Sequence, residues 1–199
     1  FLGGGDGALP MGGLLIRSGE IYGGTHDMGD TGRGTVFRLS PPVAPASNWS
    51  KTIIHRFAAV PGKTWALSSS LVFDTAGALY GTTIYGGAFG YGRVFKLTRS
   101  IWTQWNFTTL YSFKNSPDGG YPLSGLTFDG TGALYGVASW GGANSSGALF
   151  RLTPPVAPAS DWTEGVVYSF KGAPDGINPV GAPIVDTSGV LYGVTANGG

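Results

Sequence analysis

The chain repeats itself, and this feature constrains its fold more than any other. Four strings share an aliphatic residue, a tyrosine and a glycine: IYGG at 21–24, LYGT at 79–82, and LYGV at 134–137 and 191–194. Their tyrosines are 58, 55 and 57 residues apart. This regular spacing predicts a single repeat array over residues 1–199, with copies at about 1–56, 57–112, 113–169 and, incompletely, 170–199.

Three further strings recur in each period. They are a Phe-x-Leu string at 35–40, 93–98 and 148–153, a string led by Trp and closed by Phe at 48–57, 104–113 and 161–170, and a string before a turn at 13–17, 70–74, 125–129 and 182–186. All are rich in Val, Ile, Leu, Phe and Tyr and are bounded by Gly, Pro, Asp or Asn, which is the signature of β-strands. We name them the Tyr-Gly, Phe-x-Leu, Trp and turn strands, and expect four antiparallel strands per period.

Composition supports an all-β fold. Glycine and proline supply 36 and 13 residues, which leaves few windows long enough for a helix. A content of 42% hydrophobic and 13% aromatic residues is too high for a disordered chain, and the glycines lack the three-residue period of collagen. Four-stranded units repeating at about this length are typical of β-propeller blades. A β-sandwich and a β-solenoid are the alternatives.

The array holds about 3.5 blades, beginning with a turn strand and ending after a Tyr-Gly strand. Closed propellers have four to eight blades, so we expect open sheet edges at Phe1–Ile16 and Asn178–Gly199. The strands at these edges, 13–17 and 191–195, carry neither the lysine nor the proline that usually blunts an edge. We expect both half-blades to be completed by further repeats or by a second copy, giving a seven-bladed ring or a filament.

Charge and cysteine content exclude several classes of protein. The net charge is +1 without a basic run, so no nucleic-acid partner is expected. No apolar stretch approaches 18 residues, so no membrane span is expected. Cysteine is absent, which rules out disulfides and thiolate metal sites. The sequence predicts no cofactor.

The segment at 113–153, FKNSPDGGYPLSGLTFDGTGALYGVASWGGANSSGALFRLT, resembles the GloVer-type tandem repeat of large secreted bacterial proteins with varied surface-anchoring tails. The likeness spans the whole chain. The second copy departs from it, with AVPGKTWAL at 59–67 where the others have an Asp-Gly step. The resemblance implies a repeat-built extracellular or cell-surface protein, and it transfers no catalytic residue.

Both histidines have structural interpretations. His55 stands in a Trp strand where the other copies have Tyr111 and Tyr168, so we expect it to substitute for them. His26 lies close to Asp27 and Asp30, which suggests either a metal site or a polar hairpin tip. The spacing fits neither a zinc site nor a calcium loop, so the sequence predicts no metal site.

Aspartates recur at two positions of the repeat. Asp6, Asp118 and Asp175 each precede a glycine in the loop before the turn strand. We expect each carboxylate to accept a backbone N–H two residues on, with a bound cation or catalysis as alternatives. The turn strands end in Asp74, Asp129 and Asp186 in the same way, and in Arg17 in the first copy. The tyrosines of the Tyr-Gly strands are expected in the core between blades, each with a hydroxyl that needs a partner.

Aromatic residues that vary between copies are the candidate ligand-binding residues. Tyr85 and Trp140 directly precede a Gly-Gly step, where the other copies have Asp27 and Asn197. Trp65 and Tyr121 stand eight residues past the Phe of a Trp strand, where the other copies have Leu9 and Asn178. In an up-and-down meander these loops emerge on one face, together with Asp6, Asp118 and Asp175. The rings either stack on a sugar or protein, or fold back onto their own blade.

Three function classes remain open. The first is a non-catalytic structural, adhesive or assembly module of the cell exterior. The second is a glycan-binding propeller that uses the loop aromatics, with polysaccharide as its partner. A propeller lyase or hydrolase is the third, but no G-x-S-x-G, P-loop or paired-carboxylate pattern supports it. N-x-S/T sequons occur at Asn48, Asn106 and Asn144.

Overall fold

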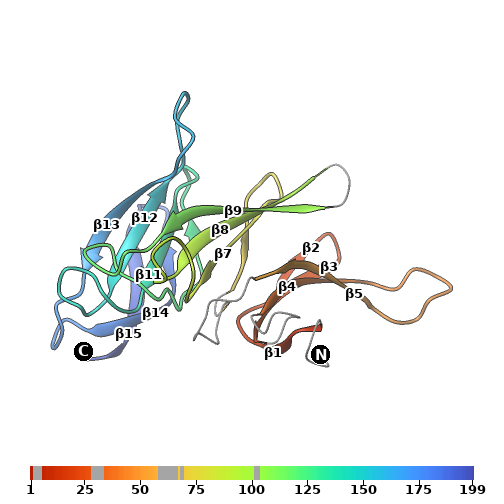
Figure 1. Ribbon diagram of the computed structural model, residues 1–199, viewed down its shortest axis with the longest axis horizontal. Helices are drawn as coiled ribbons and strands as arrows, with labels where there is room; N and C mark the ends of the chain where they lie inside the picture. Colours follow the sequence, from red (N-terminus) through yellow and green to blue (C-terminus); the bar gives the residue numbers. More distant parts are fainter. Residues whose placement is uncertain (2–5, 28–33, 58–66, 68–69, 101–103) are drawn as a thin grey trace.

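A computed structural model describes residues 1, 6–27, 34–57, 67, 70–100 and 104–199. In these residues fifteen β-strands and no α-helix occur. The strands form three antiparallel sheets and a two-stranded pair, and the sheets follow one another in chain order from right to left in Figure 1. The predicted all-β fold with four-stranded antiparallel sheets is confirmed for the second and third sheets, whereas the first sheet has a fifth strand.

The four groups have the following strands. The first sheet contains β1 (Ala8–Pro10), β2 (Leu15–Arg17), β3 (Glu20–Asp27), β4 (Thr35–Ser40) and β5 (Ser50–Arg56). The second sheet contains β6 (Val72–Phe73), β7 (Leu79–Thr83), β8 (Arg93–Arg99) and β9 (Trp105–Ser112). The third sheet contains β10 (Thr127–Phe128), β11 (Leu134–Ala138), β12 (Ala148–Thr153) and β13 (Thr163–Ser169). The terminal pair contains β14 (Ile177–Val185) and β15 (Leu191–Asn197).

Each complete sheet pairs the glycine of its Tyr-Gly strand with the phenylalanine of its Phe-x-Leu strand. The pairs are Gly23 with Phe37, Gly81 with Phe95, and Gly136 with Phe150. A Cβ atom on these glycines would lie 2.7, 2.8 and 2.5 Å from the Cζ atom of the paired ring. Only glycine allows such a close approach, which explains the Tyr-Gly motif physically.

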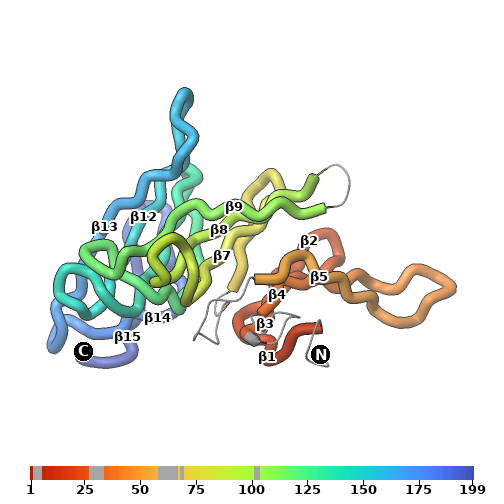
Figure 2. Tube along the Cα trace, viewed as in Figure 1, coloured from red at the N-terminus to blue at the C-terminus, as the bar shows by residue number. Residues whose placement is uncertain are grey.

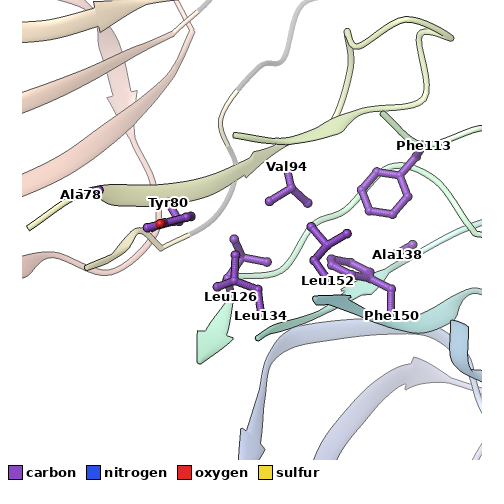
Figure 3. Close-up of a cluster of buried hydrophobic side chains, with 9 residues drawn as sticks. All are labelled: Ala78, Tyr80, Val94, Phe113, Leu126, Leu134, Ala138, Phe150 and Leu152. Atoms are coloured by element: carbon purple, nitrogen blue, oxygen red, sulfur yellow. The ribbon is translucent and has the colours of Figure 1, made fainter. Parts of the chain in front are cut away.

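Neighbouring sheets share phenylalanine contacts. The Phe that follows a Trp strand packs edge-on against the Phe-x-Leu ring of the next sheet, with ring centroids 5.3 Å apart for Phe57–Phe95 and 5.0 Å for Phe113–Phe150. Phe1 makes the same contact with Phe37 at 5.1 Å. Figure 3 shows the cluster around Phe113 and Phe150, which lies between the second and third sheets. The core therefore sits between sheets.

Two of the Tyr-Gly tyrosines occupy the core as predicted. Tyr22 packs against Phe73 and Trp105 of the second sheet, and its hydroxyl donates to Glu20 at 2.7 Å. Tyr80 makes equivalent contacts with Phe128 and Trp162 of the third sheet, and its hydroxyl donates to Asp74 at 2.9 Å. The prediction is wrong for Tyr192, which is 55% exposed. The terminal pair has no following sheet among the described residues to cover it.

The N-terminal half-blade predicted at Phe1–Ile16 is also wrong. Strand β2 pairs with β3, and the same sheet continues through β4 and β5. The turn strand thus belongs to the sheet that follows it, so the first sheet contains all four strand types. At the other end, the terminal pair comprises only a turn strand and a Tyr-Gly strand.

Two of the three aspartates that close the turn strands behave as predicted, whereas Asp74 accepts the backbone N–H of Ala78, four residues on, at 2.8 Å. Asp129 and Asp186 accept the backbone N–H two residues on, from Thr131 and Ser188, each at 2.8 Å. In the first copy, where Arg17 replaces the aspartate, Glu20 accepts the tyrosine hydroxyl instead.

The surface carries the three sequon asparagines, all of which are exposed. The connections between β4 and β5 and between β12 and β13 extend away from the sheets (Figure 2). Within the described part of the chain, no helix is long and apolar enough to cross a membrane.

Candidate functional site

An aromatic cleft lies between the loops of the second and third sheets. Its volume is about 440 Å³, within the range of small-molecule sites. The lining residues are Ile84, Tyr85, Asn115, Tyr121, Leu123, Trp140, Gly141 and Ser145. Three of the four aromatic residues singled out from the sequence are among them. The fourth, Trp65, lies outside the described residues.

Loops of two kinds build the cleft, as the strand directions require. Tyr85 and Trp140 follow the Tyr-Gly strands β7 and β11, whereas Tyr121 lies in the link from β9 to β10. The ring centroid of Tyr121 is 5.6 Å from that of Tyr85 and 5.8 Å from that of Trp140, both edge-on. Tyr91 packs against Tyr121 at 5.5 Å. Tyr121 is thus the centre of an aromatic cluster, while Trp140 stays 45% exposed.

Backbone hydrogen bonds hold the central tyrosine in place. The N–H of Tyr121 donates to the carbonyl of Tyr91 at 2.7 Å, which ties this link to the loop of the second sheet. Gly120 and Trp140 exchange two backbone hydrogen bonds of 2.8 and 3.2 Å, which tie it to the third sheet. The cleft is therefore preformed by main-chain contacts rather than by side chains alone.

The cleft gathers residues with unusual backbone conformations. Tyr121, Asn115 and Ser145 have φ values of 53°, 77° and 59°, in the left-handed region that side chains rarely adopt. Leu9 and Asn178, at the position of Tyr121 in other copies, share its conformation. Among the described residues, Gly172 is the counterpart of Asn115 in another copy, and Gly90 is the counterpart of Ser145. Polar side chains thus occupy strained positions at this cleft, a pattern typical of functional sites.

The chemistry of the lining is apolar and uncharged. Rings and aliphatic side chains supply the walls, and polar groups come from the Asn115 amide, the Ser145 hydroxyl and the tyrosine hydroxyls. No acidic or basic side chain lines the cleft among the described residues. Such a site suits a neutral ligand with hydroxyl groups and an apolar face.

The recurring aspartates act as loop anchors in a way that differs from the prediction. Asp118 is 3% exposed and accepts the backbone N–H of Lys114, four residues before it, and the hydroxyl of Tyr111 at 2.5 Å. Asp175 accepts from Lys171 and Tyr168 in the same manner, at 2.8 and 2.7 Å. The expected N–H donor two residues on is therefore wrong for these two loops, because the carboxylate points back toward the Trp strand.

Asp6 has different partners. It forms ion pairs with the side chain of Lys51 and with the N-terminal ammonium group of Phe1. None of the three recurring aspartates lines the aromatic cleft.

Glu164 is a titratable residue that sequence reasoning missed. It lies on β13, at a position where the first two copies have Lys51 and Phe107, so it is the one acidic residue at this position of the three copies. Burial, followed by the charge of Asp118, raises the pKa of Glu164 to about 7. Its buried Oε1 atom has no hydrogen-bond partner among the described residues. Ionisation of this carboxyl therefore lowers the stability of the folded state.

Replacing Glu164 with glutamine should therefore stabilise the protein at neutral and basic pH. In the unfolded chain the carboxyl ionises near its ordinary pKa of 4.5, so the folded state loses stability as the pH rises from there through 7. We expect Glu164→Gln to raise the free energy of unfolding by about 1–2 kcal/mol at pH 8, after allowance for solvent screening, and to change it little at pH 4. Urea denaturation at both pH values measures the difference. Equal effects at the two pH values would contradict the assignment.

Neither histidine lines the cleft. His55 stacks on Phe107 with centroids 4.4 Å apart, and burial together with the charge of Arg93 lowers its pKa to about 4. His55 thus takes a packing position, as predicted. His26 is 9% exposed, whereas Asp30 lies outside the described residues. Among the residues that are described, no group of three potential metal ligands occurs.

Comparison with known proteins identifies the repeat. A family model described as the Gloeobacter/Verrucomicrobia repeat matches residues 1–199. The chain belongs to this family. This match confirms the resemblance to the GloVer-type repeat over residues 1–199. No curated protein matches the sequence.

A solved structure supports the fold of the Gloeobacter/Verrucomicrobia repeat chain. It is an X-ray structure of a protein provisionally described as a gluconolactonase, with a TM-score of 0.53 and 18% sequence identity. The match covers 91% of this chain and 56% of that protein, so the chain spans little more than half of its length. At this identity the likeness shows the fold alone, which is all-β and propeller-like.

Proposed function

We propose that this chain is a non-catalytic adhesive module of the cell exterior that binds neutral glycans in the aromatic cleft. One observation carries the proposal: Tyr85, Tyr121 and Trp140 converge on a cleft with no charged lining among the described residues. In its finer architecture, we propose a propeller arrangement with about 3.5 blades in these 199 residues.

The geometry favours a sugar as the ligand. A pyranose ring has one apolar face that stacks on an aromatic ring and equatorial hydroxyls that need hydrogen-bond partners. The 45% exposed ring of Trp140 offers a stacking surface at the rim of the cleft. The amide of Asn115 and the hydroxyl of Ser145 supply donors and acceptors beside it. Their uncharged character favours neutral over uronic-acid polymers.

The lining also favours binding over hydrolysis. Most glycoside hydrolases place two carboxyl groups on either side of the scissile bond. In the described part of the chain, no aspartate or glutamate lines this cleft. Asp118, which shares the link from β9 to β10 with Tyr121, is 3% exposed and hydrogen-bonded to Tyr111 and Lys114. We therefore expect no turnover of glycoside, ester or phosphate substrates.

Replacing Trp140 with alanine tests the proposed site. Tryptophan and tyrosine are enriched among the contact residues whose truncation weakens binding most, so we expect at least about fivefold weaker binding of a neutral polysaccharide. Titration calorimetry with β-glucan, xylan and mannan fragments measures the affinity. Tyr85→Ala should act in the same direction.

Trp49 provides the matched control. It is 49% exposed and precedes β5, in a connection that leaves the sheets at the end away from the cleft. Trp49→Ala should leave the affinity unchanged. Equal losses in the Trp49 and Trp140 variants, or the absence of binding to any neutral saccharide by the unmodified protein, would contradict the proposal.

A further inference from the structure

The terminal pair contains an unfilled copy of the glycine–phenylalanine contact. In each complete sheet, a Cβ atom on the glycine of the Tyr-Gly strand would collide with a phenylalanine ring at 2.5–2.8 Å. The equivalent glycine of β15 is Gly193, and a Cβ atom there would meet nothing within 4 Å. Strand β15 thus has the glycine against which a phenylalanine ring packs in the other sheets, but no ring lies against Gly193. We call this position the phenylalanine site of β15.

Phe170 forms the opposite wall of this phenylalanine site. Phe170 follows the Trp strand β13, and its counterparts Phe57 and Phe113 are 1% and 0% exposed because a Phe-x-Leu ring covers each of them. Phe170 is only partly buried. Gly193 and Phe170 line one cavity of about 260 Å³, together with Leu149, Tyr168 and Val194. Since an apolar cavity of about 150 Å³ holds benzene, this one has room for a phenyl side chain.

The edge of β15 is open along its length. Among the described strands it pairs only with β14, whereas the Tyr-Gly strands β3, β7 and β11 each have neighbours on both sides. Two of its apolar side chains, Tyr192 and Val194, are 55% and 65% exposed. An edge with unpaired backbone groups and apolar side chains is a template for another strand.

We propose that β15 and the cavity beside it form a receptor for one additional Phe-x-Leu strand. That strand pairs antiparallel to β15, with its phenylalanine opposite Gly193 and its ring in the cavity against Phe170. The register follows from the pairs Gly23–Phe37, Gly81–Phe95 and Gly136–Phe150. The same register places the preceding residue of the strand opposite Val194.

The occupant is a hairpin of a further repeat of the same kind, not a second copy of these 199 residues. The Phe-x-Leu strands β4, β8 and β12 are each paired on both edges, so a folded copy has none to donate. A further repeat also supplies a Trp strand, whose tryptophan would cover Tyr135 as Trp105 covers Tyr22 and Trp162 covers Tyr80. A ring closed by two copies that exchange strands is therefore not expected.

A peptide that reproduces residues 92–100, GRVFKLTRS, tests the receptor on the full chain. We expect saturable binding by fluorescence anisotropy, and at least tenfold weaker binding of the same peptide with Phe95→Ala. In the protein, Gly193→Val places its Cβ atom where no atom lies within 4 Å, in the space meant for the ring, and should weaken binding of the unmodified peptide at least tenfold. Gly165→Val is the matched control, because Gly165 also lies in a strand with nothing within 4 Å of its Cβ position.

Cross-linking tests the register. The chain contains no cysteine, so a disulfide reports one chosen contact. The protein with Val194→Cys should form a disulfide with the peptide carrying Val94→Cys, the residue that pairs with Thr82 in the second sheet. The peptide with Arg93→Cys, whose side chain points to the other face, should cross-link poorly. The absence of peptide binding at millimolar concentration, equal binding by the Gly193→Val variant, or equal cross-linking of the two peptides would overturn the proposal.

Discussion

Replacing Phe95 with alanine is expected to lower the free energy of unfolding by about 3–5 kcal/mol, a large part of the stability of an ordinary domain. The ring is fully buried and contacts Phe57 of the first sheet and Phe107 of its own sheet, with centroids 5.3 and 5.5 Å away. Its removal opens a cavity between two sheets that the surrounding strands cannot close. Urea denaturation followed by tryptophan fluorescence measures the loss.

Phe89 is the control for this substitution. It lies in the loop before β8 and is 54% exposed, so Phe89→Ala should change the stability by less than about 0.5 kcal/mol. The double variant with Phe57→Ala and Phe95→Ala should lose less than the sum of the single variants, because both rings share one contact. Strict additivity would argue against the inter-sheet core.

Replacing Gly141 with alanine should destabilise the protein by about 3 kcal/mol or more and remove the aromatic cleft. The residue has a φ of 69°, and a Cβ atom would lie 1.9 Å from the backbone oxygen of Asn115. That oxygen accepts the N–H of Gly142 at 2.8 Å, so it cannot move without breaking the loop contact. Chemical denaturation measures the stability, and saccharide titration measures the cleft.

Gly132 separates conformational strain from collision. It has a φ of 86° in the turn between β10 and β11, and its Cβ position is open. Gly132→Ala should lower the free energy of unfolding by only about 1–2 kcal/mol, which is the cost of the left-handed backbone conformation alone. Similar losses at the two glycines would mean that the contact between Gly141 and Asn115 is not tight.

Local chemistry explains which parts of the fold were predictable. Strand positions follow from runs of apolar residues between turn residues, and both signals lie within a few positions of each other. The assignment of strands to sheets is a non-local property. The turn strand at 13–17 was separated from its sheet because the repeat has no intrinsic starting point, and only the pairing of β2 with β3 settles its membership.

The site was predictable in its residues but not in its geometry. Variation between copies singled out Tyr85, Tyr121 and Trp140, and strand direction placed their loops on one face. The left-handed backbone of Tyr121, which turns the ring toward its neighbours, has no signal in the local sequence. Glu164 was missed because its environment comes from Tyr111 of the preceding copy and from Asp118, both distant from it in the sequence. Aligning the copies at this position would have singled out this glutamate.

The phenylalanine contacts between sheets have a consequence for how the array folds. Each sheet buries its central ring only when the sheet before it is in place, as Phe57 does for Phe95 and Phe113 does for Phe150. Stability in such a chain is a sum of weak units and strong nearest-neighbour couplings, as in a one-dimensional cooperative lattice. The second sheet makes such a contact on both sides, through Phe95 and Phe113, so we expect it to be the most tightly coupled of the three sheets.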